Sequence, residues 1–217
     1  MNLEQARANM VEQQIRPWEV LDQAVLDLLY TVPREEFVPA AYRNLAFADM
    51  EIPIGEGERM MAPKIEARLL QSLALGKTDR VLEVGTGSGY LTALLARSAA
   101  HVHSLEIRPA LAAFGRANLE RQAVDNVTLE IGDGARGDPK RAPYDAIVLT
   151  GSTPVLPATL REQLAPGGRL FAVVGEPPIM VARLVTCAAP GTYGAVNLFD
   201  TLLAPLVNAE RAPQFRF

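Results

Sequence analysis

Three acidic side chains stand where predicted strands end, and their spacing suggests how a small ligand is held. Glu83 lies near the end of a short apolar run, Glu106 ends the next predicted strand, and Asp133 follows the third. Glu106 comes about 20 residues after Gly85, where an acid holds ribose hydroxyls in nucleotide-binding α/β folds. Asp133 is placed to accept a hydrogen bond from an adenine amine. The three acids together predict a site for an adenosine-type ligand.

A glycine-rich turn follows the first of these acids. Gly85, Gly87 and Gly89 alternate between the apolar run and a helical repeat that starts at Tyr90. Glycine permits the positive φ of a tight turn and lets a ligand lie against bare backbone. The dinucleotide pattern G-x-G-x-x-G needs a glycine where Tyr90 stands. The pattern E-x-G-x-G-x-G, with a carboxylate before the turn, instead suits S-adenosylmethionine, which carries an ammonium and a sulfonium but no pyrophosphate.

The elements that position these residues alternate strand and helix from Arg80 onward. We expect strands over 81–84, 101–106, 127–131, 144–149 and 169–174, and helices from 90, over 109–122 and over 157–164. Such alternation predicts a parallel sheet. It breaks after residue 174, because 180–187 and 196–203 both look extended and the turn at 190–194 leaves no room for a helix. We therefore expect an antiparallel hairpin to close the sheet.

The first 75 residues have a different pattern. It predicts helices over 3–15, 21–32 and 63–75, an extended stretch at 51–54 and a loop at 55–58. We expect residues 1–75 to form an N-terminal helical extension that packs on the ligand-binding domain, 76–217. The extension is not expected to fold alone, so the two parts make one structural unit.

Composition sets the outer limits on function. The 217 residues include 21 basic and 25 acidic side chains, giving a net charge of −4 without a basic run, so nucleic acid is not an expected partner. No apolar run approaches the length of a membrane span, and no signal peptide is expected. The single cysteine, Cys187, fits a reducing compartment and hence the cytoplasm. His101 and His103 have no cysteine or acid pair at ligand spacing, so no metal is expected.

Several short segments extend the pattern well beyond the glycine turn. The most particular are V-P-R-E-E-F-V-P at 32–39 and I-P-I-G at 52–55. The others are M-V-E-Q-Q-I at 10–15, A-P at 62–63, V-L-E-V-G-T-G-S-G-Y at 81–90, G-D-G at 132–134, P-Y-D-A-I at 143–147, Q-L-A-P-G-G-R at 163–169 and A-P-L at 204–206. With these segments the chain resembles the protein-L-isoaspartate O-methyltransferase family over nearly its whole length.

The resemblance implies both a fold and an activity. The fold is the Rossmann-like class I methyltransferase fold with a seven-stranded, mostly parallel sheet. The activity is methyl transfer from S-adenosylmethionine, with S-adenosylhomocysteine as product, to the free carboxylate of an isoaspartyl residue. The ester then collapses to a succinimide, which hydrolyses partly to normal aspartate and so repairs damaged proteins or peptides.

The resemblance also implies which residues hold the cofactor. By position, it assigns the methionine part to Glu83, Gly85, Thr86, Gly87 and Ser88, the ribose to Glu106 and Ile107, and the adenine to Asp133 and Gly134.

One segment departs from the family pattern. Where the family reads Gln-Thr-(Ile/Val)-Ser-(Gln/Ala)-Pro, residues 58–63 read Glu-Arg-Met-Met-Ala-Pro, so Met61 replaces the active-site serine. A thioether is a poor hydrogen-bond partner. An ionised carboxylate nevertheless attacks a sulfonium methyl without a general base, and catalysis then depends mostly on alignment. Losing one positioning hydrogen bond costs roughly 1.5–3 kcal/mol. Arg59 is a candidate replacement, because its guanidinium fork suits a carboxylate.

Three interpretations stay open at this point. The chain is a divergent repair methyltransferase that lacks the serine, a methyltransferase for a small-molecule acceptor with Met60 and Met61 lining an apolar cleft, or a non-catalytic protein that binds S-adenosylmethionine. Thr150–Ser152 either contact substrate or form only a turn. We expect the loop at 55–61 and the extension to act as a lid that excludes water. The sequence does not indicate an oligomeric state.

Overall fold

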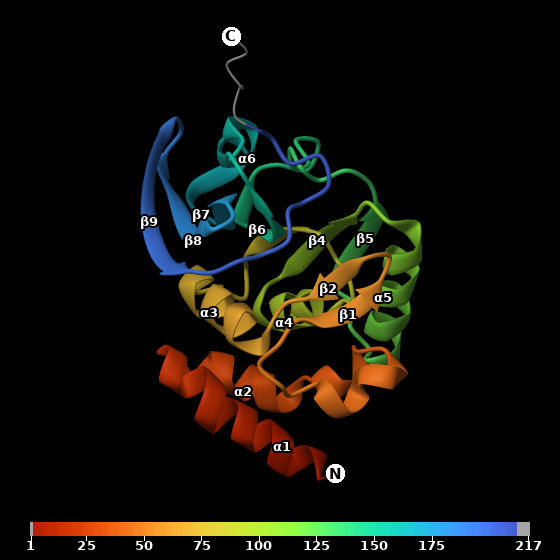
Figure 1. Cartoon of the computed structure of the whole chain (residues 1–217). Helices are drawn as coiled ribbons and strands as arrows, with labels where there is room; N and C mark the ends of the chain where they lie inside the picture. The colour runs from red at the N-terminus through yellow and green to blue at the C-terminus, as the bar shows by residue number, and fades with distance from the viewer. Residues whose placement is uncertain (1, 212–217) are drawn as a thin grey trace.

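A seven-stranded sheet in the order β5-β4-β3-β6-β7-β8-β9 forms the centre of the computed structural model, which describes residues 2–211 (Figure 1). β3 to β7 pair in parallel, whereas β8 and β9 pair antiparallel with their neighbours. This confirms the predicted mostly parallel sheet with an antiparallel C-terminal hairpin. The strands span Arg80–Val84 (β3), His101–Glu106 (β4), Val127–Ile131 (β5), Tyr144–Thr153 (β6), Leu164–Glu176 (β7), Ile179–Ala189 (β8) and Thr192–Asp200 (β9).

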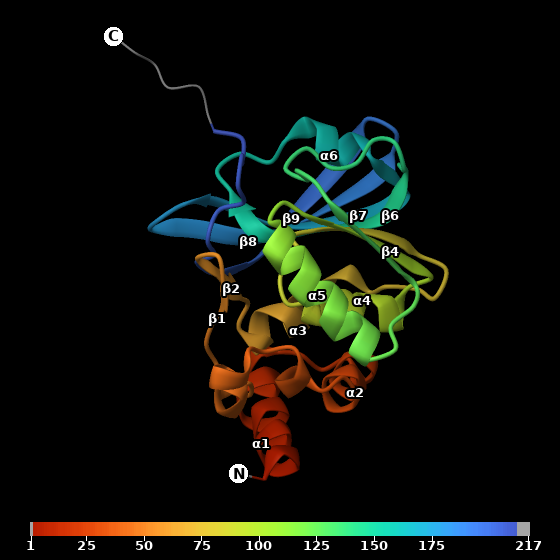
Figure 2. The same ribbon diagram turned by 90° about the vertical axis from the view of Figure 1, so that its right-hand side faces the viewer.

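The helices form layers on the sheet (Figure 2). α3 (Pro63–Leu73), α4 (Tyr90–Ser98) and α5 (Pro109–Arg121) cover one face, and the short α6 (Ala158–Glu162) lies on the other. α1 (Leu3–Met10) and α2 (Gln23–Thr31) form a further layer beyond α3 and α4. Within residues 2–211, no helix combines the length and the apolar character needed to cross a membrane.

The sequence of α4 explains why it needs partners on both sides. Every residue from Tyr90 to Ala96 is buried, and a helix that is apolar all round must be covered all round. The sheet covers one side and the N-terminal segment covers the other. One apolar cluster accordingly contains Met10 and Phe37 from the extension together with Leu94 from α4. The boundary at residue 75 remains a prediction, since this cluster runs across it.

The N-terminal segment is more irregular than its sequence suggested. α1 continues into a π-helical turn, η1 (Val11–Ile15), and a 3₁₀ turn, η2 (Arg16–Trp18). Two further 3₁₀ turns follow α2, η3 (Arg34–Glu36) and η4 (Ala40–Leu45). β1 (Ile52–Gly55) and β2 (Glu58–Met60) form a separate antiparallel hairpin.

Several predicted boundaries are wrong; β6 and β7 are longer than expected, and two other differences have a clear physical reason. Glu58 was placed in a loop but begins β2, a strand of three residues that is too short to show an alternating pattern. β9 begins at Thr192 rather than residue 196, because the glycine-containing stretch that resembles a turn pairs with β8, for example Gly194 opposite Thr186. Pairing between strands here overrides the local turn propensity.

Candidate functional site

A cleft of about 950 Å³, counted with its opening to solvent, lies at the carboxyl ends of β3, β4 and β5. Parallel sheets bind ligands at this edge. Most of the lining comes from the glycine turn, the turns after β4 and β5, the β1–β2 hairpin, and residues 203–207 near the C-terminus. Eight of the nine predicted cofactor residues belong to this lining, namely Gly85, Thr86, Gly87, Ser88, Glu106, Ile107, Asp133 and Gly134.

The glycine turn brings bare backbone to the floor of the cleft. Gly85 has a φ of 98°, in the region that favours glycine, and an added Cβ would collide with the hydroxyl of Thr150. That hydroxyl bonds the carbonyl oxygens of Val84 (2.8 Å) and Gly85 (2.9 Å). Thr150 therefore lines the cleft from within β6 and is not part of a turn. Only glycine at position 85 allows β6 to support the turn so closely.

Glu106 connects the glycine turn to the next segment of the lining. Its Oε2 accepts a hydrogen bond from the amide of Gly87 (2.9 Å), and its Oε1 accepts one from the amide of Arg108 (2.9 Å). A carboxylate has about four acceptor positions, so each oxygen can accept a further hydrogen bond from a hydroxyl. This buried carboxylate can thus hold a diol, such as that of a ribose, beside the neighbouring Ile107.

Asp133 is held in place by two neighbours. Its Oδ1 accepts from the amide of Ala135 (2.9 Å), and its Oδ2 accepts from the side-chain amide of Asn208 (2.9 Å). The second contact joins residues 75 positions apart in sequence. Beside Asp133, a Cβ at Gly134 would lie 2.7 Å from Cγ1 of Val84, so this turn also packs tightly on β3.

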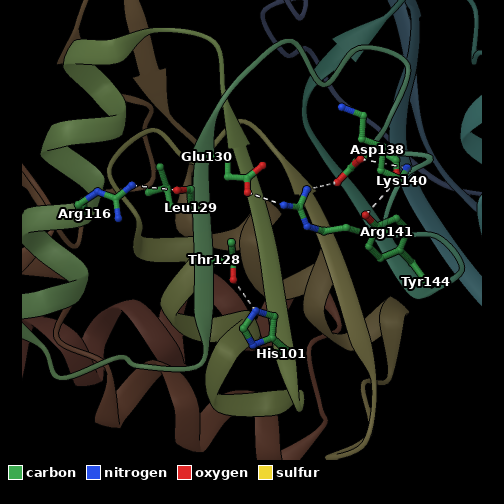
Figure 3. A network of polar contacts seen from close by, with 9 residues as sticks. All are labelled: His101, Arg116, Thr128, Leu129, Glu130, Asp138, Lys140, Arg141 and Tyr144. Carbon is green, nitrogen blue, oxygen red and sulfur yellow. Dashed lines mark hydrogen bonds and ion pairs between the residues drawn. The ribbon is translucent and has the colours of Figure 1, made fainter.

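A polar network ties the loop after Asp133 back to the sheet (Figure 3). Arg141 bridges Glu130 of β5 (2.5 Å) and Asp138 of the loop (2.8 Å). The hydroxyl of Tyr144 donates to the carbonyl oxygen of Asp138 (3.1 Å). These contacts lie away from the cleft, and they fix the course of the loop that begins at its edge.

The two histidines belong to the same region of the sheet. His101 hydrogen-bonds Thr128 (2.9 Å, Figure 3), and its ring centre lies 4.6 Å from that of His103. Burial lowers the pKa of His103. In the part of the chain that the structure describes, no three His, Cys, Asp or Glu side chains are grouped so that they could hold a metal ion.

Glu83 is the one predicted cofactor residue that lies outside the lining. The parallel register places it opposite Ser104, and its side chain is fully buried beneath α4. Its Oε2 accepts from the hydroxyls of Thr92 (2.5 Å) and Ser104 (2.6 Å). Burial raises the pKa of Glu83 to about 8, although both hydroxyls act in the opposite direction. The geometry therefore does not support the expectation that the Glu83 carboxylate faces the ammonium group of a ligand in the cleft.

Glu83 instead supports the turn from below. The hydroxyl of Thr86 lies 2.5 Å from that of Ser104, which itself donates to Glu83. A relay of two hydroxyls thus connects the buried carboxyl to the glycine turn.

The β1–β2 hairpin supplies the opposite wall. Met60 and Met61 are almost completely buried there, while Arg59 is exposed at the opening. Among the described residues, the guanidinium of Arg59 makes no hydrogen bond or ion pair. Burial raises the pKa of the nearby Glu51 carboxyl, and the charge of Arg59 counteracts part of that rise. Both residues predicted to act on the substrate, Arg59 and Met61, therefore line the cleft.

An ion pair connects this hairpin to the sheet. Oε1 of Glu58 accepts from both Nε (2.8 Å) and Nη2 (2.6 Å) of Arg108. Each side chain is about one-third exposed. The pair spans from β2 to the turn that carries Glu106, so it joins the two sides of the cleft.

The C-terminal part of the lining was missed by the sequence analysis. Ser152 anchors it: its amide donates to the carbonyl oxygen of Ala204 (2.8 Å), and its hydroxyl donates to that of Leu203 (2.8 Å). The amide of Leu206 donates back to the carbonyl oxygen of Ser152 (2.9 Å). The only signal for this contact in the sequence was the short A-P-L segment at 204–206.

Comparisons with known proteins agree on one family. The sequence model of "Protein-L-isoaspartate(D-aspartate) O-methyltransferase (PCMT)" matches residues 5–210. A protein-L-isoaspartate O-methyltransferase from Roseiflexus castenholzii is 46% identical over 208 residues, which cover 95% of this chain and 94% of that protein. A second, from Koribacter versatilis, is 39% identical over 93% of this chain and 90% of its own.

Solved structures show the same fold. A protein-L-isoaspartate O-methyltransferase superposes with a TM-score of 0.80 at 25% identity, covering 93% of this chain and 66% of that one. A Plasmodium falciparum protein named for the same activity superposes with a TM-score of 0.80 at 23% identity, covering 95% and 99%. That structure is a complex with S-adenosyl-L-homocysteine.

Proposed function

The chain belongs to the protein-L-isoaspartate(D-aspartate) O-methyltransferase family, and from this membership we propose that it methylates isoaspartyl carboxylates. The enzyme uses S-adenosylmethionine as methyl donor and releases S-adenosylhomocysteine. Its substrates are proteins or peptides that contain isoaspartyl residues, and the result is repair. The observation that supports this most directly is the single cleft in which the glycine turn and Glu106 face a wall formed by Arg59 and Met61.

We assign the cofactor to the lining residues by their position in the cleft. The backbone of residues 85–88 holds the methionine part, Glu106 and Ile107 hold the ribose, and Asp133 and Gly134 hold the adenine. Glu83 supports the turn through Ser104 and does not touch the ligand. A small-molecule acceptor and a non-catalytic role, the two alternatives to repair, are not favoured by the comparisons.

The chemistry needs alignment more than acid–base catalysis. A carboxylate oxygen of the substrate forms a bond to the methyl carbon while the bond between that carbon and the sulfonium breaks. One negative and one positive charge are neutralised, so a wall of low polarity does not oppose the reaction. Met60 and Met61 provide such a wall, and Arg59 is free to bind the substrate carboxylate at the opening.

The first experiment measures transfer of a labelled methyl group to an isoaspartyl peptide, with the aspartyl peptide of the same sequence as control. Arg59→Gln is expected to raise KM for the isoaspartyl peptide roughly tenfold, because it removes a charged hydrogen bond to the substrate. Calorimetry should show the affinity for S-adenosylhomocysteine within about twofold of wild type. Lys64→Gln is the matched control, since Lys64 is a nearby cation that binds Asp49 (2.7 Å) outside the cleft.

Each part of the proposal has its own contrary result. If the cofactor binds but neither wild type nor Met61→Ser methylates the isoaspartyl peptide, then the acceptor is of another kind. If S-adenosylhomocysteine does not bind at all, the assignment of the cleft is wrong.

We also propose that the enzyme acts in the cytoplasm, without nucleic acid or membrane as a partner. The net charge of −4 and the free, buried thiol of Cys187 support this location.

A further inference from the structure

One buried arginine of the N-terminal extension contacts the backbone of the Met60–Met61 wall from inside the protein. Arg34, in η3, is 1% exposed, and its guanidinium bonds three separate segments. Nε donates to the carbonyl oxygen of Ala46 (2.9 Å), and Nη2 donates to that of Met61 (2.6 Å). Nη1 forms an ion pair with Glu66 of α3, which also lines the cleft. A single side chain thus links the extension to the residue at the serine position.

The same guanidinium also contacts the helix that follows the glycine turn. Its carbon lies 4.8 Å from the centre of the Tyr90 ring, and Phe37 packs on that ring edge-on with centres 5.5 Å apart. Tyr90 is the first residue of α4. Arg34 therefore lies between the wall that faces the acceptor and the helix that begins where the cofactor turn ends.

This arrangement is difficult to explain by stability alone. A buried ion pair is a weak source of stability, because the cost of desolvating both charges offsets their attraction. The contacts depend on the planar fork of arginine, which directs several donors along fixed lines. A lysine at this position keeps the charge but cannot reach Ala46, Met61 and Glu66 at once. The arginine therefore sets the position of the Met61 backbone more precisely than an apolar contact can.

We propose that Arg34 is a positioning residue for methyl transfer, which holds the Met60–Met61 wall at the distance that the acceptor requires. This inference rests on the proposed function. It gives the first part of the N-terminal extension a role in the acceptor site, although none of the described residues before Glu51 lines the cleft. Arg34 does not touch the reacting groups and acts through the backbone of Met61.

The test compares Arg34→Lys with Arg7→Lys. Arg7 is a second, largely buried arginine of the extension that pairs with Glu35 (2.5 Å) and does not line the cleft. For Arg34→Lys, kcat/KM for the isoaspartyl peptide should fall about tenfold or more, while the affinity for S-adenosylhomocysteine stays within about twofold. Arg7→Lys should lower the melting temperature and leave both values unchanged. Equal kinetic losses in the two variants would overturn the proposal.

A second measurement does not depend on turnover. The ε-methyl signal of Met61 in protein labelled with ¹³C-methyl methionine, assigned with Met61→Leu, should shift in Arg34→Lys but not in Arg7→Lys. If wild type fails to methylate the peptide, the proposed function fails, and this signal still decides whether Arg34 positions the wall. An unchanged signal in Arg34→Lys would refute that role.

Arg34→Lys removes buried contacts and is expected to lower the stability of the fold, so Glu66→Gln serves as a second variant. It replaces the ion pair with a weaker hydrogen bond to a neutral amide oxygen, at nearly constant volume. The proposal requires a larger loss of kcat/KM than in Arg7→Lys at unchanged cofactor affinity, and kinetics equal to those of Arg7→Lys would contradict it.

Discussion

Burial gives Glu83 a different role from the one that its place in the glycine motif suggests. In the folded protein its carboxyl accepts from Thr92 and Ser104 and has a pKa of about 8. The unfolded chain has the ordinary value of 4.5. Between pH 4.5 and about pH 8, the carboxyl of Glu83 keeps its proton in the folded protein but has released it in the unfolded chain. Its stability must therefore fall as the pH rises through this window, and the effect of Glu83 is constant below and above it.

The expected result for Glu83→Gln follows from this sign. Glutamine resembles the protonated carboxyl and does not titrate, so the variant should lose less stability between about pH 5 and pH 8. Relative to wild type it should gain up to about 1.4 kcal/mol for each pH unit in that range. Urea unfolding of both proteins at a series of pH values measures the difference. A difference that does not change with pH would show that Glu83 is ionised in the folded protein.

The predictability of the site residues depends on how far apart in sequence their contacts lie. Gly85, Glu106 and Asp133 could be placed at one cleft because each lies in or beside a turn whose residues are contiguous. Arg34 was not singled out, because its contact with Met61 lies 27 residues away. Ser152 was placed near the cleft, but its contact with Leu203, 51 residues away, was not foreseen. Local pattern carries no information about such distant partners. Glu83 lies outside the cleft lining because its side chain points toward Thr92 and Ser104, a direction that the motif alone does not reveal.

At the scale of elements, the β1–β2 hairpin forms one side of the cleft. The ion pair between Glu58 and Arg108 joins it to the opposite side. Residues 54 and 58–61 line the cleft, which places the hairpin where the expected lid would lie. The hydrogen bond from Arg108 to Glu58 raises the pKa of Arg108, so the guanidinium keeps its charge. We therefore expect this pair to slow the opening of the hairpin.

Glu58→Gln should accelerate the release of S-adenosylhomocysteine a few-fold, because partly exposed ion pairs contribute only modestly. Stopped-flow displacement measures this rate. Glu56→Gln removes the same charge from the same turn without breaking a hydrogen bond, so it should have a smaller effect. High salt should reduce the difference between wild type and Glu58→Gln. Identical release rates in all three proteins would mean that the hairpin does not control exit.

Most elements could be predicted because their patterns are long enough to show a period. β3 to β8 and α2 to α5 each have a continuous apolar face or run, and the sequence located them. β2 has only three residues, and the 3₁₀ turn η4 has no regular apolar face. Their geometry is set by packing against the rest of the molecule, which a local pattern does not contain.

At the scale of the whole molecule, the extension and the sheet share one interior. Tyr90 of α4 packs against Phe37, and Arg169 of β7 donates to the carbonyl oxygen of Leu73 (2.8 Å). Removing residues 1–75 would expose one whole side of the helix layer. The proposed division into residues 1–75 and 76–217 therefore marks a change in the sequence pattern and does not separate two folding units. Neither part is expected to be stable alone.

A fragment of residues 76–217 should accordingly fail to unfold cooperatively, because the apolar surface of α4 becomes exposed. We expect strong binding of a hydrophobic dye and a broad thermal transition, measured against the full chain under the same conditions. A sharp transition together with normal affinity for S-adenosylhomocysteine would show that the domain is autonomous.

Residues 203–207, the C-terminal part of the cleft lining, are synthesised after all seven strands of the sheet. A ribosome that has made the whole sheet, up to Asp200, has not yet supplied the residues that bond Ser152 and Asp133. A nascent chain at that stage has the floor of the cleft without one of its sides. We therefore expect the complete cleft to form only after residues 203–208 have left the exit tunnel.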